Sequence, residues 1–440
     1  MTDESKSHPK IAVLYFANLT GNEENSYVCA GITEEIIRKL SRIDGLTVVS
    51  RSDVLPCRNL DVDTCEFGRC MGVDFVLEGG VWEATAGMEV VTKLVDVGKG
   101  RDVTTARFAI SAKDILAVPG DAAVRIAEIL DIPIGPDQRK TLTRPVTEDL
   151  RAYEQYMRGR ELLSLRGVKN NETAIQVLES AVALDPGFAA AHGSLGEAYS
   201  NMYNYYDSDE GWLEKIVDAS ERAIALDPDS VEPRFNLGIV HFHKREYEKA
   251  KATFESIIQL RARYYEGYRW LGIVSDVTGR YDDALRYYEK SAEIKPCSVE
   301  PWLYMNMTYR RKGDIEAAKY AAKRFLEVGI KTLQIIPDDP VTLSRFSVIY
   351  TLFGDRQKAY DAVNRILDKD PDDGLVLYNC AATFALLNDN DRSLECLRRA
   401  LGSGYKNIRE WINSDPDFDD LRDTEEFRTL LSKFDLLHGG

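Results

Sequence analysis

Short apolar runs alternate with amphipathic stretches over the first 130 residues. Ile11–Phe16 is a continuous apolar run, which suits a buried strand. Gly31–Ser41 follows with isoleucine and leucine at helical spacing. The same pattern predicts further strands and helices, which are strands Leu46–Ser50, Asp74–Glu83, Met88–Val97 and Arg107–Ile110 and helices Glu66–Met71 and Asp121–Leu130. We therefore expect a small α/β or α+β domain.

The first predicted helix has polar residues near its expected start. Thr33 is expected to cap it, because a hydroxyl can accept from the free amides of a first turn. Glu34 and Glu35 would then lie in that turn, facing the positive end of the helix dipole.

A proline-rich stretch follows this region. Pro133, Gly135 and Pro136 stand close together and are expected to end the preceding helix and leave a short stiff link. The chain is therefore divided into an α/β domain at 10–135, a linker at 136–148, a helical array at 149–402 and a helical cap at 403–440.

The pattern after residue 149 is helical and repeats at intervals of 34 residues. Ala250, Ala284 and Ala318 keep this spacing, as do Gly238 and Gly272. Such a period is the signature of stacked helical pairs, in which no pair buries its apolar face alone. About seven pairs fit into the array. Two longer intervals indicate insertions at Tyr203–Gly211 and Glu327–Asp339.

These repeats resemble the tetratricopeptide (TPR) family over residues 150 to 400. The resemblance implies an all-α right-handed solenoid that holds other molecules along its concave face.

The N-terminal region resembles the amino-terminal domain of TolB-like, or FlgO-like, proteins. The residues that carry this resemblance are Ile11–Asn18, Gly31–Glu35, Val48–Arg51 and Gly72–Gly79. In bacterial proteins of this kind, the two modules often follow a nucleotide cyclase, a protein kinase or a winged-helix domain. The resemblance therefore implies a signalling or regulatory setting. Only Met1 to Pro9 precede the N-terminal domain, so we expect the catalytic or DNA-binding domain to be missing here.

Composition narrows the range of partners. The net charge is −16, which disfavours nucleic acid and anionic membranes. No apolar run is long enough for an export signal or a membrane span. Seven scattered cysteines argue for a reducing compartment, and we expect a cytoplasmic protein. The oligomeric state is left open.

Residues for catalysis or metal binding are sparse. No phosphate loop, nucleophile elbow or zinc helix occurs, and the chain has five histidines. Cys57, Cys65 and Cys70 lack a zinc-binding spacing, and His241 and His243 point to different sides of a helix. We expect no enzyme activity, no cofactor and no metal.

The middle repeats carry the candidate binding residues. From Val231 to Ile330 there are 18 Lys and Arg and 14 Asp and Glu, a local charge of +4 in a chain that otherwise carries −20. Residues expected to line the concave groove there are Phe235, Ile239, His243, Arg269, Ile273, Met307, Arg310 and Arg311. Arginines would grip carboxylates and the apolar residues would add contact area. The alternative is that these charges form a solvated face and the aromatic residues are core.

The sequence thus predicts a non-catalytic scaffold or adaptor, in bacterial signalling or regulation, that binds an acidic protein or peptide segment. One alternative is a sensor, in which the N-terminal domain binds a small ligand and the repeats relay the signal. A second is an enzyme, which the lack of an acid–base or metal cluster disfavours.

Overall fold

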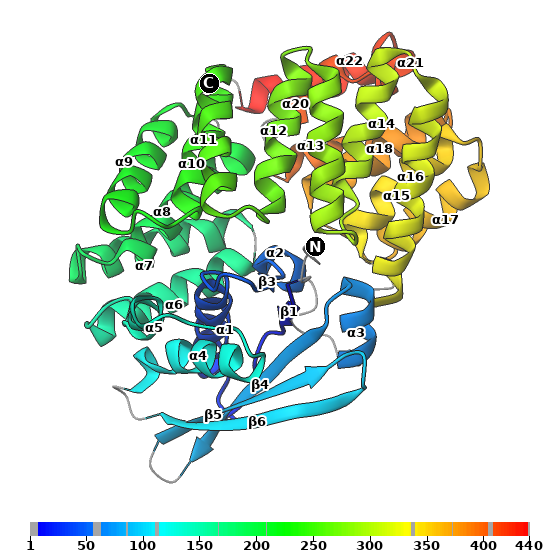
Figure 1. Cartoon of the computed structure of the whole chain (residues 1–440). Helices are drawn as coiled ribbons and strands as arrows, with labels where there is room; N and C mark the ends of the chain where they lie inside the picture. The colour runs from blue at the N-terminus through cyan, green and yellow to red at the C-terminus, as the bar shows by residue number, and fades with distance from the viewer. Residues whose placement is uncertain are drawn as a thin grey trace. The chain divides into compact units, whose positions relative to one another are not determined.

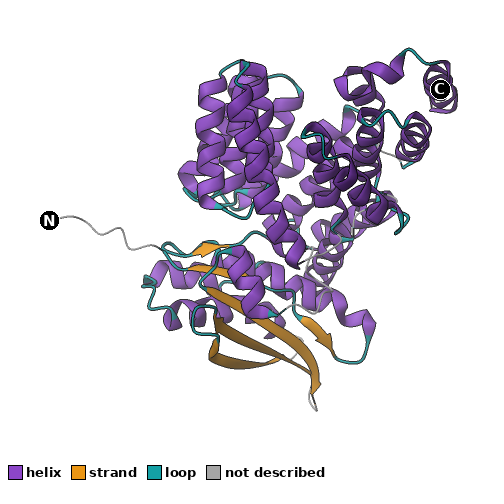
Figure 2. Cartoon of the chain, turned by 90° about the vertical axis from the view of Figure 1, so that its right-hand side faces the viewer, coloured by secondary structure: helices purple, strands orange, loops and turns teal. Residues whose placement is uncertain are grey.

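The computed structural model describes residues 8–55, 63–84, 87–110, 114–165, 167–207, 209–335, 339–371, 373–403 and 408–438. The chain forms two compact units (Figure 1). The first contains Met1–Ala198 and Lys215–Pro301, and the second contains Tyr199–Glu214 and Trp302–Gly440. All described strands belong to the N-terminal region, and the rest is helical (Figure 2).

The N-terminal region folds around a mixed sheet. Within the described residues it has six strands, β1 (Lys10–Val13), β2 (Ala17–Leu19), β3 (Thr47–Val48), β4 (Phe75–Ala84), β5 (Gly87–Asp96) and β6 (Arg101–Ile110). They are ordered β3-β1-β4-β5-β6, and β2 also pairs with β4. The β1, β2 and β3 pairings are parallel, whereas β4, β5 and β6 form an antiparallel meander. An α/β domain is thereby confirmed.

Helices cover the sheet on both faces. They are α1 (Ser26–Leu40), α3 (Thr64–Met71) and α4 (Val118–Ile129), and the short helix α2 (Arg51–Val54) follows β3. Gly68 of α3 lies against Val76 and Val97. On the other face, α4 lies over Leu77 of β4 and the neighbouring strands, and α1 packs beside α4.

The expected cap at Thr33 is wrong. Helix α1 begins at Ser26, after a 3-10 turn over Glu23–Asn25 that is capped by Asn22. Thr33 therefore lies in the middle of α1, where its hydroxyl donates to the Cys29 carbonyl and accepts from the Phe16 amide. That last bond takes Phe16 out of the strand ladder, which explains why the expected strand Ile11–Phe16 ends at Val13.

The expected linker contains helix α5 (Pro136–Thr143). Its Leu142 is fully buried, and the Leu142 carbonyl approaches Gly120 of α4 so closely that a Cβ there would lie 2.6 Å from it. The Lys39 ammonium of α1 donates to the Arg144 carbonyl at 2.6 Å. This segment is therefore packed against the N-terminal domain.

Helical pairs make up the rest of the chain, as expected. The fourteen helices in the described part are α6 (Leu150–Ser164), α7 (Val168–Leu184), α8 (Ala189–Asn201), α9 (Gly211–Leu226), α10 (Glu232–His243), α11 (Tyr247–Leu260), α12 (Tyr265–Val277), α13 (Tyr281–Ile294), α14 (Glu300–Lys312), α15 (Ile315–Ile335), α16 (Pro340–Leu352), α17 (Arg356–Leu367), α18 (Gly374–Leu386) and α19 (Asn390–Gly402). They form seven consecutive pairs, which we number as repeats one to seven. The predicted solenoid is confirmed.

Two irregular elements lengthen the 34-residue interval. A π-helical turn over Met202–Tyr206 follows α8, and α15 is 21 residues long. After α19, the helices α20 (Ile408–Ser414), α21 (Asp419–Arg422) and α22 (Glu425–His438) close the second unit. Phe418 and Phe427 from this segment are buried in one apolar cluster with α18 and α19.

A glycine in the first helix of each of the first four repeats sets how closely the two helices approach. A Cβ added at Gly238 would lie 2.6 Å from the Phe254 ring, and one at Gly272 would lie 2.4 Å from the Tyr288 ring. The complete set of facing pairs is Gly159 with Leu178, Gly196 with Ser220, Gly238 with Phe254 and Gly272 with Tyr288. These contacts define an equivalent position in each repeat.

Gly238→Ala should therefore destabilise the protein although alanine favours helices. The methyl group would overlap the buried Phe254 ring, and overpacking costs about 1–3 kcal/mol, more than the roughly 1 kcal/mol gained in helix propensity. Gly193→Ala in α8 is the matched control, because the nearest side-chain atom would lie 3.9 Å away. Thermal unfolding followed by circular dichroism should show a lower midpoint for the first variant alone. Equal midpoints would contradict the close-approach argument.

Candidate functional site

The glycine contacts identify equivalent residues on the first helices of the repeats. The residue after each glycine is Arg160, Glu197, Ile239 or Ile273, and Met307 follows Ile273 by one 34-residue interval. Three of these five were expected to line the groove. The first two repeats therefore place charges of opposite sign where the later repeats carry aliphatic side chains.

The expected groove residues of repeat three are largely packed. The Phe235 ring stands edge-on to the rings of Phe254, Tyr264 and Trp270, with centroids 5.8, 6.3 and 6.2 Å away. Ile239 is 6% exposed, within the same core cluster. His243 is half-buried, and burial lowers its pKa. Phe235 and Ile239 therefore contribute mainly to the core of repeat three, and little of their surface is accessible to a partner.

Repeats four and five leave more of the expected side chains accessible. Arg269 is half-buried with its guanidinium 5.9 Å from the Trp270 ring centroid, and Ile273 is half-buried. Met307 is 40% exposed, and Arg310 and Arg311 are exposed. The residues of repeats three and four belong to the first compact unit and those of repeat five to the second.

Helix α1 of the N-terminal domain packs on α6, the first helix of repeat one (Figure 1). Gly31 permits this approach, because a Cβ there would lie 2.3 Å from Cγ of Met157. Both helices belong to the first unit.

Four charged side chains form a closed ring at this contact. The Glu34 carboxylate accepts from Nε of Arg160 at 2.6 Å and from Nε of Arg51 at 2.6 Å. The Glu197 carboxylate accepts from Nη1 of Arg160 at 2.5 Å and from Nη1 of Arg51 at 3.1 Å. Acid and base alternate, so the ring has no net charge. We call Glu34, Arg51, Glu197 and Arg160 the charge ring.

The surroundings keep the charge ring ionised. Burial by itself would raise the pKa of both glutamates, but Arg160 and Arg51 outweigh it. They lower the pKa of Glu34 and bring that of Glu197 to about 2. Tyr15 donates to Glu34 at 2.9 Å, and Ser194 accepts from Arg160 at 3.1 Å. The side chains of Glu34 and Arg160 are only 5% and 11% exposed. Removing the partner of either one would leave a buried charge uncompensated and would destabilise the folded state.

More polar residues of α1 extend this contact. Arg38 pairs with Glu35, with Nε and Oε2 2.8 Å apart, and Arg42 pairs with Asp227 just after α9. Burial lowers the pKa of the Lys39 ammonium to about 8. One side of α1 is thus devoted to charges that meet the repeats or α5.

The charge ring was missed at the sequence level, although a signal existed. Glu34 and Glu35 were assigned to a first helical turn, and the structure places both in the middle of α1. Arg160 and Glu197 stand at the register position of Ile239. Repeats three and four have isoleucine at this position. The charged residues in repeats one and two therefore indicate that this position makes a different contact there.

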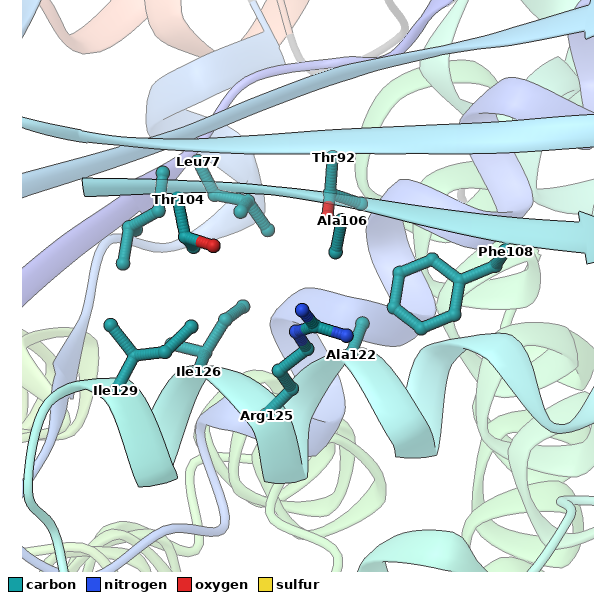
Figure 3. A pocket seen from close by; sticks show the side chains of 10 residues that line it. Leu77, Thr92, Thr104, Ala106, Phe108, Ala122, Arg125, Ile126 and Ile129 are labelled. Atoms are coloured by element: carbon teal, nitrogen blue, oxygen red, sulfur yellow. The ribbon is translucent and has the colours of Figure 1, made fainter. Parts of the chain in front are cut away.

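The N-terminal domain contains one small cavity among its described residues that bears on the sensor alternative. A cavity between α4 and the strands β4, β5 and β6 is lined by Leu77, Thr92 and Arg125 among others (Figure 3). It offers about 10 Å³, roughly the space of one water molecule. This cavity does not favour the sensor alternative.

Metal-binding residues do not cluster in the described ranges. No group of three His, Cys, Asp or Glu side chains there could hold an ion. Cys57 lies outside the described residues, and Cys65 and Cys70 are partly buried on α3. His241 instead contacts Glu246, with Nδ1 and Oε2 2.7 Å apart. None of the described helices combines the length and apolarity that a bilayer crossing requires.

Two family models match parts of the chain. Residues 6–121 match the second domain of HilA/YgeH-like transcriptional regulators. This match corrects the expected TolB-like or FlgO-like resemblance of the N-terminal domain. Residues 244–297 match a tetratricopeptide repeat model, which confirms the repeat type in the array.

Known relatives share part of the chain. "Putative adenylate cyclase 3" of Rhizobium meliloti (strain 1021) is 28% identical over 249 residues, which are 55% of this chain and 42% of the relative. Anaphase-promoting complex subunit 3 of Schizosaccharomyces pombe is 28% identical over 177 residues, or 40% of this chain and 25% of the relative. The chain thus spans less than half the length of these two relatives.

A tetratricopeptide repeat protein from Parabacteroides merdae ATCC 43184 is a similar solved structure. Its TM-score is 0.41 at 14% identity, over 60% of this chain and 98% of that one.

Acid should weaken the first unit through Glu197. A pKa of about 2 in the folded protein, against an ordinary 4.5, stabilises the folded state above pH 4.5, and this contribution disappears as the pH falls towards 2. Glu197→Gln should flatten the fall of the thermal midpoint between pH 5 and 2, relative to the unmodified chain. Glu289→Gln, at an exposed site on α13, is the control and should leave the fall unchanged. Identical pH profiles for all three chains would contradict the role of the charge ring.

Proposed function

We propose that this protein is a non-catalytic interaction scaffold that works without a cofactor and holds an acidic, partly apolar segment of a partner protein. The middle repeats would hold this segment in the concave groove. TPR arrays are a fold of interaction scaffolds, and the repeat model matches residues 244–297, which contain the second helix of repeat three and both helices of repeat four. The setting would be bacterial signalling or regulation in the cytoplasm.

The observation that carries the proposal is a change in the inner side of the array. In repeat one, that side is occupied by α1, and the charge ring joins Arg160 of repeat one and Glu197 of repeat two to the N-terminal domain. In repeats four and five, Ile273 and Met307 stand at the same register position and keep exposed surface. Each unit therefore keeps exposed surface at this position, at Ile273 in the first unit and at Met307 in the second.

The chemistry of this surface indicates the kind of partner. Arg269 lies beside Ile273, and Arg310 and Arg311 lie one turn from Met307. Guanidinium groups bind carboxylates through paired hydrogen bonds, and the local charge of +4 would steer an acidic segment towards them. Phe235, Ile239 and His243 would support this surface from repeat three.

The regulatory setting is supported by similarity. The N-terminal match is to a domain of transcriptional regulators, and one relative bears an adenylate cyclase name. Neither similarity transfers an activity to this chain, because each covers only part of the proteins compared. A separate effector would then supply any catalytic step.

Charge reversal should separate the proposed surface from the rest of the protein. We expect Arg310→Glu with Arg311→Glu, and separately Arg269→Glu, to weaken binding of acidic peptides at least about tenfold, because each replaces an attraction with a repulsion. Peptides selected from a display library against the unmodified chain would serve as probes, with affinities measured by fluorescence anisotropy.

Matched controls carry the same change of charge elsewhere, singly for comparison with Arg269→Glu and combined for comparison with the double variant. Arg286→Glu in α13 and Lys319→Glu in α15 alter exposed residues paired only with neighbours on their own helix. They should leave affinity within about twofold. Peptides without acidic residues emerging from the selection, or equal losses in variants and controls, would refute the proposed surface.

A further inference from the structure

We propose that Arg160 and Ser194 form a carboxylate-binding site on the inner side of repeats one and two, and that Glu34 of the same chain occupies it as an internal ligand. A partner segment would gain this site when the N-terminal domain undocks. This inference concerns a different surface from the proposed partner site of the middle repeats and does not depend on it.

Ser194 and Glu197 fix the orientation of the Arg160 guanidinium, as neighbouring residues do in a preformed binding site. The Arg160 side chain is 11% exposed, and Nη1 is oriented by Ser194 at 3.1 Å and by Glu197 at 2.5 Å. These partners come from α8, so the repeats themselves position the guanidinium. Nε remains directed at the Glu34 carboxylate 2.6 Å away. The group that Nε binds is thus supplied by another domain.

Glu34 meets this site on a helix, as a partner segment could. The carboxylate projects from the middle of α1, and Gly31 one turn earlier lets the helix lie against Met157. Small residues beside an acidic residue allow a helix to approach closely enough for a direct ion pair. The geometry is that of a helical peptide bound along the first helices of the repeats.

The docked state combines the packing of Gly31 against Met157 with several polar contacts. Besides the charge ring, Arg42 joins α1 to Asp227 of the repeats. Interfaces of this polar kind are typical of domains that can separate. In addition, Nη2 of Arg51 is buried without a hydrogen-bond partner in the described residues, which makes the docked state less favourable. Opening would return these groups to water.

Undocking of the N-terminal domain leaves Arg160 and Glu197 of the repeats without their partners Glu34 and Arg51, and this indicates the class of ligand. Arg51 departs with the N-terminal domain, so Arg160 needs a carboxylate and Glu197 needs a cation. A helix with an acidic and a basic residue one turn apart would satisfy both. Glu34 and Arg38 of α1 have this spacing. We therefore assign the site to an amphipathic helix with an acid–base pair.

The test uses the full chain and a labelled peptide with the sequence of residues 26–40, in which Cys29 is replaced by serine. Glu34→Lys places a third cation beside Arg51 and Arg160 and should open the contact. Fluorescence anisotropy should then show at least tenfold tighter peptide binding than to the unmodified chain, whose own Glu34 fills the site. Asp227→Lys opens the contact from the repeat side, leaves the N-terminal domain unaltered, and should also increase affinity.

A second substitution identifies the residue that binds. Adding Arg160→Glu to the Glu34→Lys chain should abolish the gain, whereas adding Arg151→Glu, at an exposed arginine of the same helix, should preserve it. Hydrogen exchange of β4 and β5 would verify that the sheet stays folded in each variant. Equal peptide affinity in closed and opened chains, binding that survives Arg160→Glu, or no binding to any chain would each overturn the inference.

Discussion

The contact between α1 and the first repeats depends on one constraint, which is that a buried charge must keep its partner. Glu34 and Arg160 are almost inaccessible to water, and each is bound to two groups of opposite charge. Removing any member of the charge ring would leave another buried charge uncompensated, at a cost of several kcal/mol. The ring therefore determines which face of α1 meets which face of the repeats, since a shift by one residue would break the two ion pairs that cross the contact, Glu34–Arg160 and Arg51–Glu197.

A second constraint is the close approach of the two helices within each of the first four repeats, which fixes where Arg160 and Glu197 lie. Glycine in the first helix of repeats one to four lets one side chain of the second helix (Leu178, Ser220, Phe254 or Tyr288) approach the backbone. Because this contact recurs, the following residue always occupies the same place in its repeat. Charge at this place in repeats one and two suits the polar contact with the N-terminal domain, whereas repeats three to five carry Ile239, Ile273 and Met307 there. The same position in the repeat thus carries two kinds of chemistry.

The helical pairs could be predicted from the sequence, whereas the contacts between the N-terminal domain and the repeats could not. The 34-residue spacing of Ala250, Ala284 and Ala318 was sufficient for the helical pairs, because each pair repeats the same packing problem. The charge ring joins residues from Glu34 to Glu197, and a pairing across more than 150 positions has no periodicity. The same limit explains why α5 was read as a linker, since its burial depends on Gly120. The TolB-like resemblance failed because short strand motifs recur in different α/β domains.

The coupling free energy between Glu34 and Arg160 tests this account most directly. Glu34→Gln, Arg160→Met and the double variant form a cycle, and native-state hydrogen exchange of α1 amides reports the opening free energy of each. The account predicts a coupling of at least about 1.5 kcal/mol, in the range of close interfacial charge pairs. Additive effects of the two substitutions would show that the residues do not hold α1 against the repeats, and would contradict it.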